Sequence, residues 1–113
     1  MPPLAAKFLI SLAIVASASS PLRAGDAVTY ETTLKGNGFT VAEIKVPAGK
    51  PFIMKMTNAN AAPAELEAKE LKIEKVAAGN STIVVRVKAM KPGKYLFMDE
   101  YQEDVAKGYI IAE

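Results

Sequence analysis

The chain has 113 residues, half of them hydrophobic, which is enough for one domain with an ordinary core. It contains no cysteine and no histidine. Disulfides, thiolate or imidazole metal ligands, and catalysis by serine–histidine or cysteine–histidine pairs are therefore excluded. The formal net charge is only +2, and the lysines are scattered rather than gathered in a basic stripe, which excludes nucleic acid as a partner.

The first residues predict a secretory leader. Lys7 supplies a positive charge ahead of the apolar run "FLISLAIVASA" at residues 8–18. A run of this length fits the apolar region of a signal peptide, which has about 7–15 residues, and is shorter than the roughly 20 residues that span a bilayer. The alternative is a retained membrane anchor. With the leader removed, we expect a periplasmic protein that is at most peripheral to the membrane.

Two positions in this segment suit a signal peptidase, one after Ala18 and one after Ala24, since each has a small residue at the cleavage point. We favour cleavage near Ala24, since Pro21 interrupts the apolar run before it. The expected division is a signal peptide at residues 1–24 and one domain at residues 25–113. Removal of the leader removes two of the 14 basic residues. The remaining chain then has as many basic residues as its 12 acidic ones and is formally neutral.

Turn signals at short intervals separate strand-like runs in the remainder of the chain. The turn signals are "GNG", "PAGK", "AAGN" and "KPGK", which carry the glycine, proline and asparagine that tight turns require. Between them, apolar residues alternate with polar ones; Phe52, Met54 and Met56, for example, share one face. This pattern predicts an all-β fold, an antiparallel sandwich or barrel, with strands in residues 27–34, 42–46, 52–58, 81–89, 95–98 and 108–112.

The segment "PAELEAKELKIEKVAAG", residues 63–79, has the best helix propensity in the chain. Pro63 suits the first helical position, and Glu65 with Lys69 forms an i,i+4 pair. Its later part alternates Leu71 and Ile73 as a strand does. We therefore expect a short helical segment near residues 63–70, followed by a strand.

Three motifs carry a resemblance to a known family. They are "GFTVAEIKVPAGKPFIMKMTN" at residues 38–58, "PAELEAKELKIEKV" at 63–76 and "PGKYLFMDEYQEDVAKG" at 92–108. Together they resemble a cupredoxin-like domain. More narrowly, they resemble the small periplasmic cupredoxin-like proteins that accompany bacterial high-affinity iron permeases. The resemblance implies a Greek-key β-sandwich with any metal site at one end, and an iron permease or another periplasmic iron-uptake component as partner.

The resemblance stops at the copper ligands. Blue-copper relatives take histidines, a cysteine and often a methionine from the regions that map to residues 64–65 and 98–107, and some relatives have histidine near Lys69 and Gln102. Without histidine or cysteine, a blue-copper centre is excluded. The methionines, among them Met54, Met56 and Met98, leave Cu(I) binding as a minor alternative.

Carboxylates are the ligands that remain. The stretch "FMDEYQED", residues 97–104, holds four acidic side chains in six positions. In the fold that the resemblance implies, the acidic segment at residues 65–67 lies at the same end. Oxygen ligands suit Fe²⁺, Fe³⁺, Mn²⁺, Ca²⁺ or Mg²⁺, and the family resemblance favours ferrous iron. The predicted metal ligands are Glu65, Asp99 and Glu100, with Glu67, Met98 and Gln102 as helpers.

Other interpretations of these residues remain open. An acidic loop is most often a solvated surface, as we expect for Glu103 and Asp104, or it forms ordinary ion pairs with lysines. Two functions follow: an accessory protein of iron uptake that binds or hands on ferrous iron, or a metal-free interaction module that docks on a partner. Assistance in iron oxidation is implied only by the resemblance. Paired acids also serve glycoside hydrolases, but no aromatic-lined cleft is evident.

Overall fold

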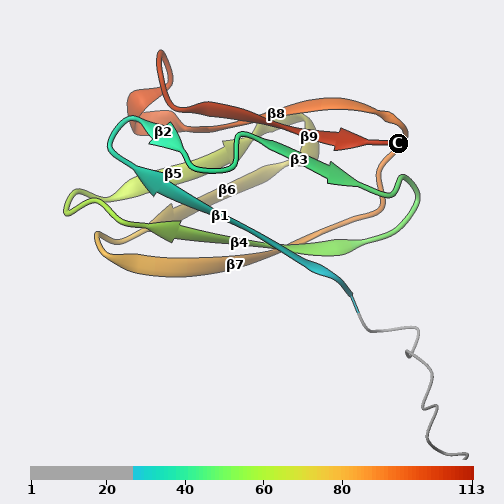
Figure 1. Cartoon of the computed structure of the whole chain (residues 1–113), viewed down its shortest axis with the longest axis horizontal. Coiled ribbons are helices and arrows are strands. Elements are labelled where there is room, and N and C mark those ends of the chain that lie inside the picture. Colours follow the sequence, from blue (N-terminus) through green and yellow to red (C-terminus); the bar gives the residue numbers. More distant parts are fainter. Residues whose placement is uncertain (1–26) are drawn as a thin grey trace, which may run out of the picture.

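The computed structural model describes residues 27–113 and contains two β-sheets packed face to face (Figure 1). The predicted signal peptide at residues 1–24 lies outside the described residues. The four-stranded sheet has the order β2-β1-β4-β7, and the five-stranded sheet has the order β3-β9-β8-β5-β6. This arrangement confirms the all-β sandwich. Within the part of the chain that the structure describes, no helix has the length and apolar character needed to cross a membrane.

The strands follow the predicted runs closely, and two further strands, at residues 38–39 and 64–68, were not predicted. The elements are β1 (Thr29–Lys35), β2 (Gly38–Phe39), β3 (Glu43–Val46), β4 (Phe52–Asn58), β5 (Ala64–Ala68), β6 (Ile73–Ala77), β7 (Ser81–Val87), β8 (Gly93–Asp99) and β9 (Lys107–Ala112), with one-turn 3-10 helices η2 (Lys69–Leu71) and η3 (Glu100–Gln102).

The expectation of an antiparallel sandwich was wrong for two of the strand pairs. β1 pairs with β4 in parallel, and β3 pairs with β9 in parallel, while the other pairs are antiparallel. Neither parallel pair is joined by a hairpin, which would force antiparallel pairing, because strands of the other sheet lie between the two partners in the sequence. Apolar alternation identifies a strand and its faces, but it carries no information on the direction of the neighbouring strand.

The expected helical segment near residues 63–70 was also wrong. Residues 64–68 form β5, which lies between β8 and β6 in the five-stranded sheet, and only the single turn of η2 follows. Lys72 then takes a left-handed conformation, with φ 57° and ψ 41°, and turns the chain back into β6. Helix propensity was overridden because Ala64, Leu66 and Ala68 bury their side chains on one face of the sheet. The expected strand after this segment is confirmed as β6.

The core lies between the sheets and uses the alternating residues that the sequence indicates. Phe52, Met54 and Met56 are all at most 3% exposed. Phe39 and Phe97 meet edge to face with ring centroids 4.9 Å apart, a favourable aromatic geometry. Met54 and Met56 thus fill the core, where their thioethers are shielded from an incoming copper ion.

Candidate functional site

One end of the sandwich gathers four connections, which we call the loop pole: residues 36–37, 59–63, 78–80 and 100–106. Figure 1 shows these connections together at the end opposite the C-terminus. Hydrogen bonds tie the first two to each other. Asn60 Nδ2 donates to Gly36 O at 2.8 Å, and Gly36 N donates to Asn60 Oδ1 at 2.7 Å. Gln102 Nε2 lies 3.3 Å from the same carbonyl oxygen and links η3 to this turn.

Asn58, at the end of β4, fixes the third connection. It is fully buried. Its Nδ2 donates to Ala62 O at 2.9 Å and lies 3.3 Å and 3.2 Å from Ala77 O and Ala78 O, while Oδ1 accepts from Asn60 N at 3.0 Å. Asn58 thus satisfies backbone groups that burial would otherwise leave without partners.

Asp99 joins β5 to the segment that follows β8. Its side chain is 1% exposed. Oδ1 accepts hydrogen bonds from Glu65 N at 2.9 Å and Tyr101 N at 3.1 Å, and Oδ2 accepts from Gln102 Nε2 at 3.0 Å. Two acidic segments that lie far apart in the sequence therefore do meet, as predicted. The Asp99 carboxylate holds them together through backbone and amide donors, which are strong partners for a buried charge.

The two acidic side chains of β5 point away from the core. Since Ala64, Leu66 and Ala68 belong to the core, strand alternation turns Glu65 and Glu67 to the outer face of the sheet. There the register sets Glu67 opposite Glu74 of β6 on one side and opposite Met98 of β8 on the other. Lys107 of β9 follows Met98 in the same row.

We call Glu65, Glu67 and Glu74 the outer-face carboxylates. Sequence reasoning did not select Glu74, because a helix near residues 63–70 gave no basis for pairing it with Glu67. A hairpin centred on residues 69–72 is the signal that finds it. Cross-strand neighbours have Cβ atoms about 4.5–5.5 Å apart, and like charges at such positions are destabilising.

Two carboxylate oxygens of this region are buried without a hydrogen-bond partner. They are Oε1 of Glu67 and Oε1 of Glu100. Glu67 as a whole is only 9% exposed, and Met98, its neighbour on β8, is 8% exposed. Leaving a buried charged oxygen without a partner is costly. Such an oxygen is a natural place for a cation.

The neighbours of Glu65 raise its pKa above the ordinary value of 4.5. Partial burial is the largest cause, followed by the charge of Glu74 and a hydrogen bond with Glu74, and then by the charges of Glu67 and Asp99. Each of these causes disfavours the ionised form of Glu65. A bound cation would act in the opposite direction and lower this pKa.

The remaining predicted residues separate into distinct environments. Glu100 is half-buried and Gln102 is committed to Asp99 and Gly36, whereas Glu103 and Asp104 are exposed. Among residues 27–113, no three acidic side chains are already placed to hold a metal ion. Cation binding here therefore requires the outer-face carboxylates to change rotamer around Glu67.

Comparison with known proteins identifies the fold family. The model of the cupredoxin-like domain matches residues 7–112. The chain belongs to the cupredoxin-like domain family. A curated relative of this cupredoxin-like domain, the uncharacterized protein RP394 of Rickettsia prowazekii (strain Madrid E), is 26% identical over 105 residues, which cover 92% of this chain and 84% of the relative.

Solved structures with a similar fold include copper proteins. Auracyanin A, a "blue" copper protein of Chloroflexus aurantiacus, superposes with a TM-score of 0.67 at 19% identity, covering 78% of this chain and all of its own. The Cu(I)-bound metal binding domain of the Cu(I)-exporting ATPase CopA of Streptococcus pneumoniae D39 superposes with a TM-score of 0.68 at 17% identity. The match covers 75% of this chain and 84% of that domain. Amicyanin of Paracoccus versutus superposes with a TM-score of 0.57 at 18% identity, and the match covers 88% of this chain and 90% of amicyanin. At these identities the likeness shows the fold alone.

The residues of this cupredoxin-like domain do not fit a blue-copper ion. Such centres take two imidazoles and a thiolate, and the sequence has neither histidine nor cysteine. In the region where the family resemblance places copper ligands, the end of β8 offers Asp99, and the segment after it offers Glu100 and Gln102. Asp99 is already hydrogen-bonded to three donors. The chemistry left at this end is that of carboxylate oxygens.

Proposed function

We propose that this cupredoxin-like domain is a periplasmic accessory protein of iron uptake, which binds ferrous iron through carboxylates and hands it on. The observation that supports this most directly is Oε1 of Glu67, which is buried without a partner beside two further carboxylates. The raised pKa of Glu65 adds that these side chains repel one another. A divalent cation would relieve both the desolvation and the repulsion.

In this proposal the predicted residues take different roles. Glu65 and Glu67, with Glu74 added, supply oxygen ligands, and Glu100 offers its own buried oxygen from the adjoining turn. Met98 lies beside Glu67 and would supply at most a thioether contact. Asp99 and Gln102 become positioning residues, because their side chains hold η3 against β5.

Weak and exchangeable binding is the form that suits a carrier. Hard and borderline cations accept carboxylate and water ligands together. A site whose ligands must first change rotamer binds less tightly than one that is already organised. Ferrous iron could therefore be released to a permease or another periplasmic component. None of the residues named in this proposal accepts an electron from iron, so iron oxidation is not part of the proposal.

Anaerobic Fe²⁺ titration of the chain without its leader tests the site, with Mn²⁺ as an oxidation-resistant probe. We expect one saturable site, lost in Glu67→Gln combined with Glu74→Gln. Glu43→Gln is the matched control, since Glu43 is an exposed glutamate on the outer face of the same sheet. Binding that persists in the double variant, or that is lost equally in the control, would remove the metal claim.

A metal-free interaction module is the second candidate function. It is favoured by the commitment of Asp99 to structural hydrogen bonds and by the lack of an organised ligand set among residues 27–113. In that case the sandwich docks on a permease or another periplasmic partner. Co-purification from cell envelopes separates the two functions. Capture of the same partner by the Glu67→Gln, Glu74→Gln variant, without metal binding by either form, would favour the module.

A further inference from the structure

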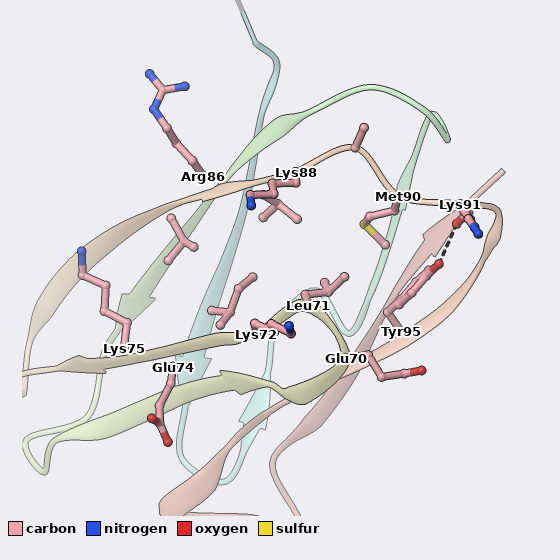
Figure 2. Close-up of a pocket in the computed structure, with 14 residues that line it drawn as sticks. Glu70, Leu71, Lys72, Glu74, Lys75, Arg86, Lys88, Met90, Lys91 and Tyr95 are labelled. Carbon is pink, nitrogen blue, oxygen red and sulfur yellow. Dashed lines mark hydrogen bonds between the residues drawn. The ribbon is translucent and has the colours of Figure 1, made fainter.

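A cleft opens between the two sheets on the side where β6 and β7 are the edge strands. Its volume is about 610 Å³, within the range of roughly 300–1,000 Å³ that small-molecule sites occupy. Figure 2 shows the cleft with β7 along one side and β6 along the other. In this view the side chain of Glu74, at the edge of the cleft, points away from it, and Glu74 is the one outer-face carboxylate that the cleft adjoins.

The floor of the cleft is apolar. It is formed by Leu71, Ile73, Val85 and Met90, which belong to the core or pack against it. Leu71 and Val85 remain half-exposed on the cleft side. A small apolar ligand placed here would extend the core between the sheets and remove these surfaces from water.

Lys75 holds the cleft open. The register pairs it with Leu66, so its side chain starts on the inner face of β6, where Ile73 and Ala77 are buried. An apolar residue at this position would close the gap between the sheets. Lys75 instead extends from β6 toward β7 in Figure 2, and its ammonium group is exposed at the mouth.

The rim carries an excess of positive charge. It comprises five cations and two carboxylates: Lys72, Lys75, Arg86, Lys88, Lys91, Glu70 and Glu74. Figure 2 shows Arg86 pointing away from the cleft on the β7 side, as Glu74 does on the β6 side. The lysines are left nearest the apolar floor, so the mouth of the cleft is complementary to an anion.

Lys72 keeps a strained backbone beside this floor, with φ 57° and ψ 41°. Left-handed φ and ψ values are unfavourable for residues with a Cβ atom, and glycine or asparagine usually takes them. Asn80, the other non-glycine residue with positive φ among residues 27–113, fits that rule. A lysine at such a position is uncommon, and this one lines the cleft.

Both ends of the cleft are restricted. At one end Tyr95 Oη donates to Lys91 O at 2.8 Å, as the dashed line in Figure 2 marks, and η2 lies beside it. At the other end residues 78–80 connect β6 directly to β7. A recess limited in this way suits one compact molecule better than an extended polypeptide.

We propose that the cleft binds an amphiphilic anion, a molecule with a short apolar chain and one carboxylate head group. The chain would lie on Leu71, Ile73, Val85 and Met90, and the head group would pair with Lys72, Lys75 and Lys88 at the mouth. This binding is independent of the iron proposal, because none of these residues belongs to the outer-face carboxylates.

The probe is decanoate below its micellar concentration, and its binding is measured by calorimetry and by NMR of the protein's methyl groups. We expect one saturable site, with shifts at Leu71, Val85 and Met90. Lys72→Gly should weaken binding about five-fold, equivalent to roughly 1 kcal/mol for one lost ion pair, while relieving backbone strain. Asn80→Gly is the matched control, because it also places glycine at a left-handed position but lies outside the cleft lining.

Four results would overturn the assignment. Equal binding of decyltrimethylammonium would show that the charge of the rim is irrelevant. Decanoate binding that leaves the methyl group of Met90 unshifted, or no saturable binding, would place the ligand elsewhere or nowhere. Capture of an acidic, valine-rich peptide without decanoate binding would assign the cleft to a protein partner. Lys75→Gln repeats the charge test at a position without positive φ.

Discussion

Replacement of Asp99 tests whether this buried carboxylate is structural or a metal ligand. Asp99→Ala removes the acceptor of three hydrogen bonds, two of them from the backbone N–H groups of Glu65 and Tyr101. Each buried donor left without a partner costs about 1–3 kcal/mol, partly offset because a buried charge also disappears. We expect a loss of about 3 kcal/mol in the free energy of unfolding, with metal absent.

Asp99→Asn should cost less, about 1 kcal/mol. The oxygen of the new side chain still accepts from both backbone groups, but its amide nitrogen would face the donating amide of Gln102. Gln102 can turn its own oxygen toward that nitrogen only by giving up its contact with Gly36 O.

Urea and thermal denaturation followed by circular dichroism measure both variants in metal-free buffer. In a domain of this size, 3 kcal/mol corresponds to a decrease of about 12–24 °C in Tm. Asp104→Ala is the control, since Asp104 is exposed, and it should change stability by less than about 0.5 kcal/mol. A stability of Asp99→Ala within about 1 kcal/mol of the native chain, or equal losses for the alanine and asparagine variants, would refute the structural role.

Two further predictions concern packing and pH. Gly108→Ala should lower the free energy of unfolding by at least about 2 kcal/mol, because a Cβ atom there would lie 2.4 Å from Phe97 Cζ and 2.8 Å from Ala42 O. Gly38→Ala is the control, since its Cβ atom meets nothing within 4 Å. Equal denaturation midpoints for the two variants would contradict the packing argument. Because the pKa of Glu65 is raised above 4.5, the folded state binds more protons than the unfolded state, so stability should fall as pH rises from about 4.5 through the raised pKa. Glu65→Gln should flatten that fall in denaturation curves measured between about pH 4 and pH 7, and an unchanged pH profile would show that Glu65 does not cause it.

Most of the fold could be predicted from alternation and turn residues. The pattern of β4 is the clearest case, since Phe52, Met54 and Met56 alternate with half-buried residues along the whole strand. The turn at Gly36, with φ 64°, and the turn at Gly49, with φ 81°, lie where glycine was expected to permit them. These signals are local, and local sequence is sufficient for them.

The failures arise where tertiary packing decides. Residues 64–68 favour a helix by composition, yet three small or apolar residues on one face bury well against the opposite sheet, and the strand prevails. That single error hid the pairing of Glu67 with Glu74. Charge patterns also could not distinguish buried Asp99 from exposed Asp104, because burial depends on which backbone donors the fold brings near each carboxylate. The inward position of Lys75 was hidden for the same reason.

The position of the outer-face carboxylates bears on what a bound cation could do. Glu67 and Glu74 lie on the outer face of the five-stranded sheet, where Glu67 is buried and Glu74 is exposed, and not in the hydrogen-bonded loops around Asp99. A cation held there would keep water ligands and exchange readily, since carboxylates on one face of a sheet cannot surround it. Such a site would be poorly suited to the rigid coordination on which electron transfer depends. Within the proposed function such a site suits a carrier, and the support for this is the register of β5 with β6 rather than the family likeness.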